Sequence, residues 1–169
     1  MQRRGFTIVE LLIAITVMGI LLVIAVVALS SSQRNARDDE RKVDIQTITS
    51  HLEDYYNGAN SSGVTGRYPT TSLTASEASI KTALRDVSTS TFIAPGSTST
   101  SQTFIAATNA TQTPEGVAPQ PTVTTYVYQP LQANGALCTG DVALTECRKF
   151  NIYYRLENDT TVKITSRHQ

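Results

Sequence analysis

The chain has 169 residues with 14 basic and 14 acidic side chains, so its formal net charge is zero. This length allows one domain with an appendage, and the balanced charge gives no reason to expect a nucleic acid or an acidic surface as partner. Apolar residues dominate residues 6–29, whereas residues 58–125 are rich in Ser, Thr, Gly and Pro. The composition therefore predicts an apolar N-terminal element followed by a more polar domain.

Residues 6–29 form an apolar run in which Glu10 is the one charged residue. A helix that crosses a membrane needs about 20 apolar residues, so the run is long enough. A secretory signal peptide is the alternative, because the basic leader MQRR precedes the run. The apolar core of a signal peptide is usually about 7 to 15 residues long and ends at a small-residue cleavage site. No clear A-x-A site follows Leu29, so the sequence favours a membrane-spanning helix.

The flanking charges and the cysteines point to opposite orientations of this helix. The flanking basic residues are Arg3 and Arg4 before the run and Arg34, Arg37, Arg41 and Lys42 after it. Their numbers would place the C-terminal domain in the cytoplasm. The two cysteines, Cys138 and Cys147, lie close together in a Gly-bearing segment, which favours a disulfide in an oxidising compartment over free thiols. Physical arguments alone leave the orientation open.

The first residues of the chain carry a specific motif. Gly5-Phe6-Thr7-Ile8-Val9-Glu10, between a basic leader and an apolar run, resembles the class III signal of type IV prepilins. The pseudopilins of type II secretion and the DNA-uptake pilins share this motif. The resemblance implies that residues 1–5 are a leader, which a prepilin peptidase removes between Gly5 and Phe6 before it methylates the new amine of Phe6. It also implies that the N-terminus lies inside and the domain outside.

The resemblance extends to about Thr70, through the helical segment after Ala36 and the Arg-Tyr-Pro-Thr string that ends there. One position departs from the family pattern. Many pilins carry a proline eight residues after the glycine found here as Gly19, and this chain has Val27 there. Gly19 weakens a helix by about 1 kcal/mol relative to alanine. Extended melting of the helix near Val27 stays an open question.

Glu10 is the residue that an apolar run does not explain. Burial of a carboxylate in a membrane costs a few kcal/mol even on permissive scales. The simpler interpretation is an acid tolerated at the membrane edge, in a first helical turn where the helix dipole favours it. The resemblance implies a role in subunit assembly, in which the amine of Phe6 in one subunit meets Glu10 of a neighbour and sets the axial register. We favour the assembly role.

The apolar run is predicted to continue as one helix to Asn57, with an amphipathic second half over residues 30–57. Ile45, Ile48, Leu52 and Tyr55 follow spacings of three and four and share one face. The charged residues at 38–44 and Glu53 fall mostly outside this face, and the acids at 38–40 are expected on an exposed face. A helix over residues 6–57 would be about 78 Å long at 1.5 Å per residue, so part of it must stand free or pack against other molecules.

Residues 58–169 are predicted to form an α+β head on an antiparallel sheet. A short helix is expected over residues 75–86, with Thr74 and Glu77 as a capping box. The repeated Thr-Phe-Ile-Ala at residues 91–94 and 103–106 indicates a loose hairpin around Pro95-Gly96. The segment TVTTYVYQ predicts a strand that ends at Pro130.

Two further strands follow from alternation of apolar and polar residues over 150–156 and 162–164. A two-residue loop between them would place Leu156 opposite Thr161. A three-residue loop over residues 158–160 places Leu156 opposite Val162 and Tyr154 opposite Ile164. Because a slip of one residue sends the apolar set to the wrong face, we predict the three-residue loop.

Motifs for catalysis, metals or cofactors do not stand out in the sequence. His51 and His168 have no metal-ligand spacing and are expected to be solvated. Basic residues from Arg34 to Lys42 are diluted by three acids, so nucleic-acid binding is not indicated. We therefore expect a protein that is not an enzyme and has no cofactor and no metal.

These expectations converge on a structural subunit of a type IV pilus filament. Its expected partners are other copies of itself, minor pilins, the prepilin peptidase, the pilus assembly platform and, before assembly, membrane lipid. The precursor would be a single-pass protein of the cytoplasmic membrane and the product an extracellular filament. The alternatives are a minor pilin, a secretion or competence pseudopilin, and a membrane-anchored binding domain. The sequence does not distinguish motility, adhesion, DNA uptake and secretion.

Overall fold

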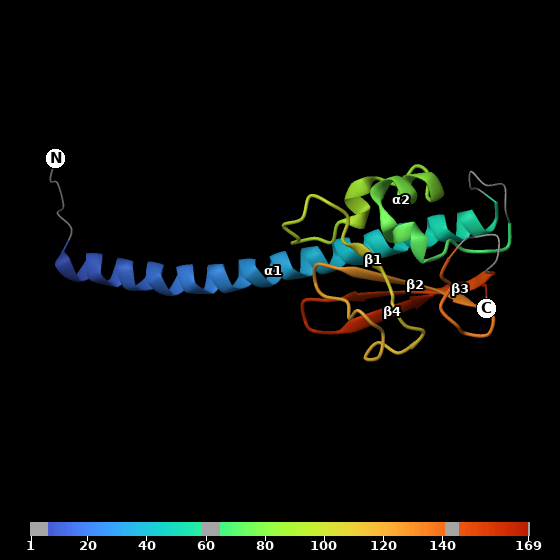
Figure 1. The fold of residues 1–169 in the computed structure, drawn as a ribbon. Coiled ribbons are helices and arrows are strands. Elements are labelled where there is room, and N and C mark those ends of the chain that lie inside the picture. Colours follow the sequence, from blue (N-terminus) through green and yellow to red (C-terminus); the bar gives the residue numbers. More distant parts are fainter. Residues whose placement is uncertain (1–6, 59–64, 141–145, 169) are drawn as a thin grey trace. The chain divides into compact units, whose positions relative to one another are not determined.

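The computed structural model describes residues 7–58, 65–140 and 146–168 (Figure 1). Its elements in chain order are α1 (Ile8–Tyr56), η1 (Thr71–Ala75), α2 (Glu77–Ala83), η2 (Thr89–Phe92), β1 (Phe104–Ala106), β2 (Tyr126–Gln132), β3 (Cys147–Arg155) and β4 (Thr161–Thr165). The predicted α+β class is confirmed. The chain divides into two compact units, residues 1–36 and residues 37–169, and α1 contributes to both.

The described part of the first unit is helical, and its apolar side chains are uncovered. The large apolar side chains from Ile8 to Leu29 are between 49 % and 87 % exposed. By length and composition, α1 could cross a membrane. A helix that is apolar all round belongs in lipid or among other helices, so this surface calls for an environment that one copy of the chain does not supply.

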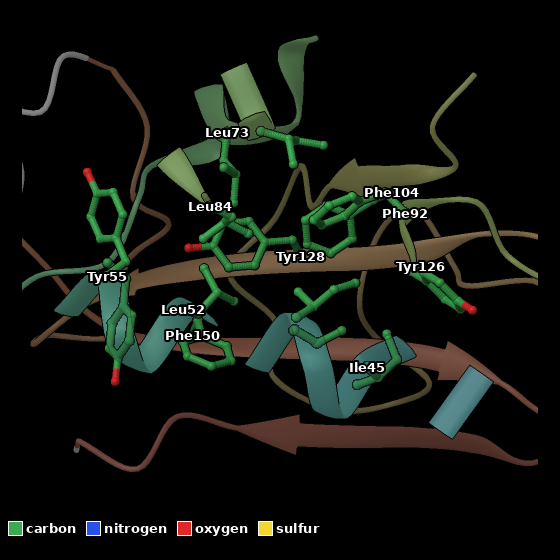
Figure 2. Packing of buried hydrophobic residues seen from close by; sticks show 14 of the residues in the cluster. Ile45, Leu52, Tyr55, Leu73, Leu84, Phe92, Phe104, Tyr126, Tyr128 and Phe150 are labelled. Atoms are coloured by element: carbon green, nitrogen blue, oxygen red, sulfur yellow. The ribbon is translucent and has the colours of Figure 1, made fainter. Parts of the chain in front are cut away.

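The second part of α1 lies in the head, which is the second unit, and contributes to its core. The predicted stripe of Ile45, Ile48, Leu52 and Tyr55 is buried, at 0 % to 5 % exposure. Figure 2 shows Ile45 and Leu52 of the helix in one cluster with aromatic rings from the sheet, among them Phe150. The cluster also contains Tyr68, Leu73, Ile80, Leu84, Phe92, Phe104 and Tyr128. The 3.6-residue periodicity of the sequence thus identifies the buried face of the helix.

The sheet of the head has the order β1-β2-β3-β4. Strands β2, β3 and β4 pair antiparallel, as predicted, whereas β1 pairs parallel with β2 and makes the sheet mixed. The hairpin expected around Pro95-Gly96 is wrong, because the first Thr-Phe-Ile-Ala copy begins in η2, which ends at Phe92, and the strand of the second copy, β1, pairs with β2. Thr103 joins the copies, since its amide donates to the carbonyl of Phe92 and its hydroxyl accepts from the amide of Ala94.

Strand β2 continues through Pro130, which the sequence interpretation placed at its end. Pro130 lies opposite Phe150, and its carbonyl accepts a hydrogen bond from the amide of Cys138 at 2.9 Å. In a strand, the N–H and C=O of one residue point to the same side. The missing N–H of Pro130 therefore faces away from β3 and removes no β2–β3 hydrogen bond.

The turn between β3 and β4 has three residues, but it lies one residue earlier than predicted. Tyr154 pairs with Val162 and Ile152 with Ile164, a shift of two positions that keeps the same side chains on the core face. The amide of Leu156 donates to the carbonyl of Thr160. The cause is Asp159, whose φ of 67° supplies the left-handed residue that ends such a turn.

Helix α2 is shorter than the predicted 75–86, and its cap is a different residue. Ser76 is the N-cap, and its hydroxyl accepts a hydrogen bond from the amide of Ser79 at 3.1 Å. Thr74 lies in η1 instead, where its hydroxyl donates to the carbonyl of Thr71. The capping box predicted from Thr74 and Glu77 is therefore wrong.

Candidate functional site

The predicted assembly residues lie at the start of the chain. Gly5 and Phe6, the predicted cleavage pair, lie outside the described residues. Glu10 lies in the first turn of α1 and is exposed. Its Oε2 accepts hydrogen bonds from the amide of Thr7 at 3.2 Å and from the hydroxyl of Thr7 at 3.1 Å. The amide of Glu10 in turn donates to the hydroxyl oxygen of Thr7 at 3.2 Å.

These reciprocal contacts form a capping box, in which a Thr and a Glu three residues later each satisfy the other's backbone N–H. The first N–H groups of any helix lack partners within the helix, and the box satisfies two of them here. The sequence interpretation missed this role of Thr7, although the Thr-x-x-Glu spacing over residues 7–10 could have indicated it. Glu10 therefore has a contact within its own chain before any neighbour is considered.

The helix behind Glu10 is continuous and open along its surface. Both Gly19 and Val27 lie within α1, and Val27 is 66 % exposed. A Cβ added at Gly19 would meet no atom within 4 Å. The glycine therefore leaves space on this side of the helix, which also carries Thr16 and Val23.

In the head, Arg41 is buried at 1 % exposure, although the sequence pattern placed it outside the apolar stripe of the helix. Its guanidinium donates to the carbonyl of Val123 at 2.9 Å and to that of Pro95 at 2.9 Å. It also contacts two carboxylates, Asp38 at 2.7 Å and Glu157 at 3.2 Å. Buried charges are retained where they are paired and hydrogen-bonded, so Arg41 joins α1 to three separate loops of the head.

Glu157 is the shared carboxylate of this cluster. Arg37 binds both of its oxygens, with Nε at 2.5 Å from Oε1 and Nη2 at 2.9 Å from Oε2. The amide of Glu157 donates to Asp38, which fixes the β3–β4 turn on α1. The hydrogen bonds from Arg37, and after them those from Arg41, lower the pKa of Glu157 to about 2. The carboxylate is therefore ionised at any physiological pH.

Asp44 is an acid on α1 whose pKa is raised in the head, whereas that of Glu157 is lowered. It is half-buried and accepts a hydrogen bond from the hydroxyl of Tyr126 at 3.0 Å. Burial raises the pKa of Asp44 against the opposing effect of the Tyr126 hydrogen bond, and together with a smaller contribution from the negative charge of Glu40 the pKa reaches about 6. This carboxyl therefore titrates close to neutral pH.

At the other end of the head segment of α1, Glu53 is buried at 5 % exposure and holds the C-terminal segment. Its oxygens accept hydrogen bonds from the hydroxyl of Tyr68 at 2.8 Å and from the amide of Arg167 at 2.9 Å. His168 stacks on Tyr56 with ring centroids 4.1 Å apart and lies 3.5 Å from Glu53. His168 is exposed, as expected for a solvated side chain, and its ring in addition packs against Tyr56 of α1.

The predicted disulfide between Cys138 and Cys147 forms, with the two Cα atoms 5.7 Å apart. The carbonyl of Cys147 accepts from the amide of Tyr68, and the carbonyl of Cys138 accepts from that of Thr71. The bridge thus holds the segment that leads into η1 against the sheet. Within the described residues, no group of three His, Cys, Asp or Glu side chains could hold a metal ion.

The long apolar N-terminal helix and the four-stranded mixed sheet define an α+β arrangement consistent with the pilin fold. Residues 1–26 match the family model described as the prokaryotic N-terminal methylation motif, which is the class III signal peptide of type IV pilins. This match confirms the resemblance noted for residues 5–10. Neither a curated protein nor a solved structure matches the chain.

Proposed function

We propose that the chain is the precursor of a structural subunit of a type IV pilus filament. The proposal rests on one observation: the methylation motif at residues 1–26 leads into a helix whose large apolar side chains, from Ile8 to Leu29, are all about half exposed or more. In this proposal a prepilin peptidase cuts between Gly5 and Phe6 and methylates the amine of Phe6. The function is polymerisation, and no catalytic step is assigned to the chain.

The apolar surface has two environments in this proposal, one before assembly and one after it. In the precursor, residues 6–29 lie in the lipid of the cytoplasmic membrane, with the N-terminus inside and the head outside. In the filament, the same surface packs against the helices of other copies. Lipid tails are as apolar as leucine, so association depends on close packing and on polar contacts between helices.

Glu10 supplies such a polar contact. The carboxylate of Glu10 in one subunit forms an ion pair with the positively charged amine of Phe6 in a neighbour and accepts its hydrogen bond. Opposite charges attract more strongly where water is excluded, so a pair inside a bundle of apolar helices favours one axial register over the others. The cost of an unpaired carboxylate in hydrocarbon has the same consequence, because it disfavours any register that leaves Glu10 alone.

The head would form the filament surface outside the cell. The disulfide between Cys138 and Cys147 supports this location, because disulfides persist in oxidising compartments. The other partners in the proposal are minor pilins and the membrane assembly platform.

The test is mass spectrometry of filaments sheared from the cell surface. The proposal expects this chain as a dominant component, with a methylated Phe6 at its N-terminus and an intact disulfide. A cleaved and methylated chain that occurs only in small amounts would indicate a minor pilin or a pseudopilin instead. A chain that keeps Met1, stays in the membrane fraction and tolerates Glu10→Ala would be a membrane-anchored binding domain and would refute the proposal.

A further inference from the structure

The head segment of α1 is attached to the rest of the head in two chemically different ways. Over residues 45–55 an apolar stripe of the helix enters the core, and Figure 2 shows Leu52 of this stripe there. The two turns before it, residues 37–44, have Arg41 as their buried side chain. The one large apolar side chain of these turns, Val43, is 60 % exposed. The contacts of residues 37–44 with the head are therefore polar.

These polar contacts are referred to together as the polar latch. They join Arg37, Asp38, Arg41 and Asp44 to Pro95, Val123, Tyr126 and Glu157. The charges of an ion pair lose water on pairing, and this loss offsets much of their attraction. When such a contact opens, water solvates both groups again, whereas an apolar side chain that opens loses its burial without compensation. The latch should therefore open at a lower cost in free energy than the apolar stripe.

We propose that the polar latch opens as one unit while the apolar stripe stays in the core, so that residues 37–44 separate reversibly from the loops that close over Arg41. In the open state Arg41 and its carboxylate partners are solvated, and the sheet stays folded. The latch opens as a unit because Arg41 joins three loops at once and Asp44 lies on the next turn of the same helix. The head thus has a conformational change that stops short of unfolding.

Asp44 makes the latch looser as pH rises towards neutral. Its carboxylate accepts the hydroxyl of Tyr126, and the other acid that faces it is Glu40, one turn earlier on α1. Burial raises the pKa of Asp44 from 3.8 to about 6. The closed latch therefore binds this proton more tightly than the open latch, and closure weakens as pH rises from about 4 to 6.

Glu157 acts in the opposite direction at lower pH. It faces the guanidinium groups of Arg37 and Arg41, and its amide donates to Asp38. The hydrogen bonds from Arg37, and after them those from Arg41, lower the pKa of Glu157 from 4.5 to about 2, so closure weakens as pH falls below about 5. The two acids together make the latch tightest near pH 4, and at pH 7 it should be open about tenfold more often.

The test is hydrogen exchange of the full chain in detergent micelles, corrected at each pH for the intrinsic exchange rates. The amide of Glu157 reports the latch, because it donates to Asp38 at 3.0 Å. The amides of β3 report the core, because this strand lies between β2 and β4. In the wild type at pH 7, we expect the Glu157 amide to open more than about tenfold more often than the β3 amides. Its opening should fall by about tenfold at pH 4.

Variants at a distance from Glu157 test whether the latch is one unit. Asp44→Asn should lower the opening of the Glu157 amide at pH 7 by about tenfold and remove its rise between pH 4 and 7. Tyr126→Phe removes the hydroxyl that Asp44 accepts and should raise this opening by about tenfold at pH 7. Ile48→Ala weakens the core alone, so it should speed exchange in β3 and leave the Glu157 amide unchanged. Glu146→Gln, which removes an exposed ion pair, should change neither.

Three results would overturn the latch. The first is a Glu157 amide that opens no more often than the β3 amides. The second is an Ile48→Ala variant that speeds both kinds of amide by the same factor, because the latch would then open only when the core unfolds. The third is a Glu157 amide that does not respond to Asp44→Asn or Tyr126→Phe, because the contacts would then open one by one. None of these measurements depends on cleavage or polymerisation, so the proposed function is tested separately.

Discussion

Replacement of Glu157 by glutamine tests whether the buried Arg41 cluster stabilises the head. The substitution keeps the size of the side chain but removes the charge that Arg37 and Arg41 share. Arg41 would remain buried at 1 % exposure with Asp38 as its one carboxylate partner. Breaking a buried ion pair from one side costs about 3–5 kcal/mol. Because the Glu157 side chain is 17 % exposed, we expect a loss of about 2–3 kcal/mol of unfolding free energy.

The pH dependence of stability gives a second measure of the contribution of Glu157 to the free energy of unfolding. The pKa of Glu157 falls from 4.5 to about 2 on folding, so the folded state holds its proton less tightly than the unfolded state. The stabilisation is therefore complete above the unfolded pKa and is lost as pH falls from about 5 towards 2. A tenfold change in proton affinity corresponds to about 1.4 kcal/mol, and solvent screening reduces the total to a value near that expected for the substitution.

The assay is urea unfolding of the full chain in detergent micelles, followed by near-ultraviolet circular dichroism between pH 2 and 7. The matched control is Glu146→Gln, which removes an exposed pair with Arg148 and should cost less than about 0.5 kcal/mol. The assigned role of the cluster is wrong if Glu157→Gln costs no more unfolding free energy than Glu146→Gln. It is also wrong if the wild type and Glu157→Gln lose stability alike below pH 5.

Three further outcomes are expected in the same unfolding assay. The wild type should lose stability as pH rises from about 4 to 6, because the pKa of Asp44 is raised to about 6 in the fold. Asp44→Asn should remove this loss and be more stable than the wild type at pH 7 by about 1–2 kcal/mol. An unchanged pH profile of stability would contradict this expectation. Paired Cys138→Ser and Cys147→Ser substitutions should cost about 2–3 kcal/mol by loss of loop closure, and reduction of the wild type should cost the same. Ile48→Ala, at a fully buried position, should cost about 2–5 kcal/mol, whereas the exposed Val43→Ala should be nearly neutral.

Periodicity was sufficient to predict the hydrophobic part of the fold. The spacing of Ile45, Ile48, Leu52 and Tyr55 identified the buried face of α1, and each of these residues is in the core. Side-chain alternation also placed the apolar residues of β3 and β4 on the correct face, although the pairing was two positions away. Such patterns survive a small error of register, because a shift by two keeps every side chain on its face.

Polar contacts over long sequence separations could not be predicted in this way. Arg41 is separated from Glu157 by 116 residues and from Val123 by 82, and neither partner differs in sequence from an ordinary loop residue. A charged residue between Glu40 and Lys42 is usually a solvated helix position, and burial of Arg41 follows from loops that close over it. The partner of β1 was wrong for a related reason: the second Thr-Phe-Ile-Ala copy does contain a strand, but it pairs with the distant β2 and not with the first copy.

The Thr-x-x-Glu pattern shows why a local motif needs its context. It occurs at Thr7–Glu10 and again at Thr74–Glu77, and the box forms at the first position alone. At the second position, Ser76 lies directly before the helix, and its hydroxyl accepts the hydrogen bond from the amide of Ser79. Ser76 is therefore the N-cap in place of Thr74. No competing hydroxyl lies between Thr7 and Glu10 in the sequence. The carboxylate of Glu10 is therefore held at the helix start by a threonine of its own chain.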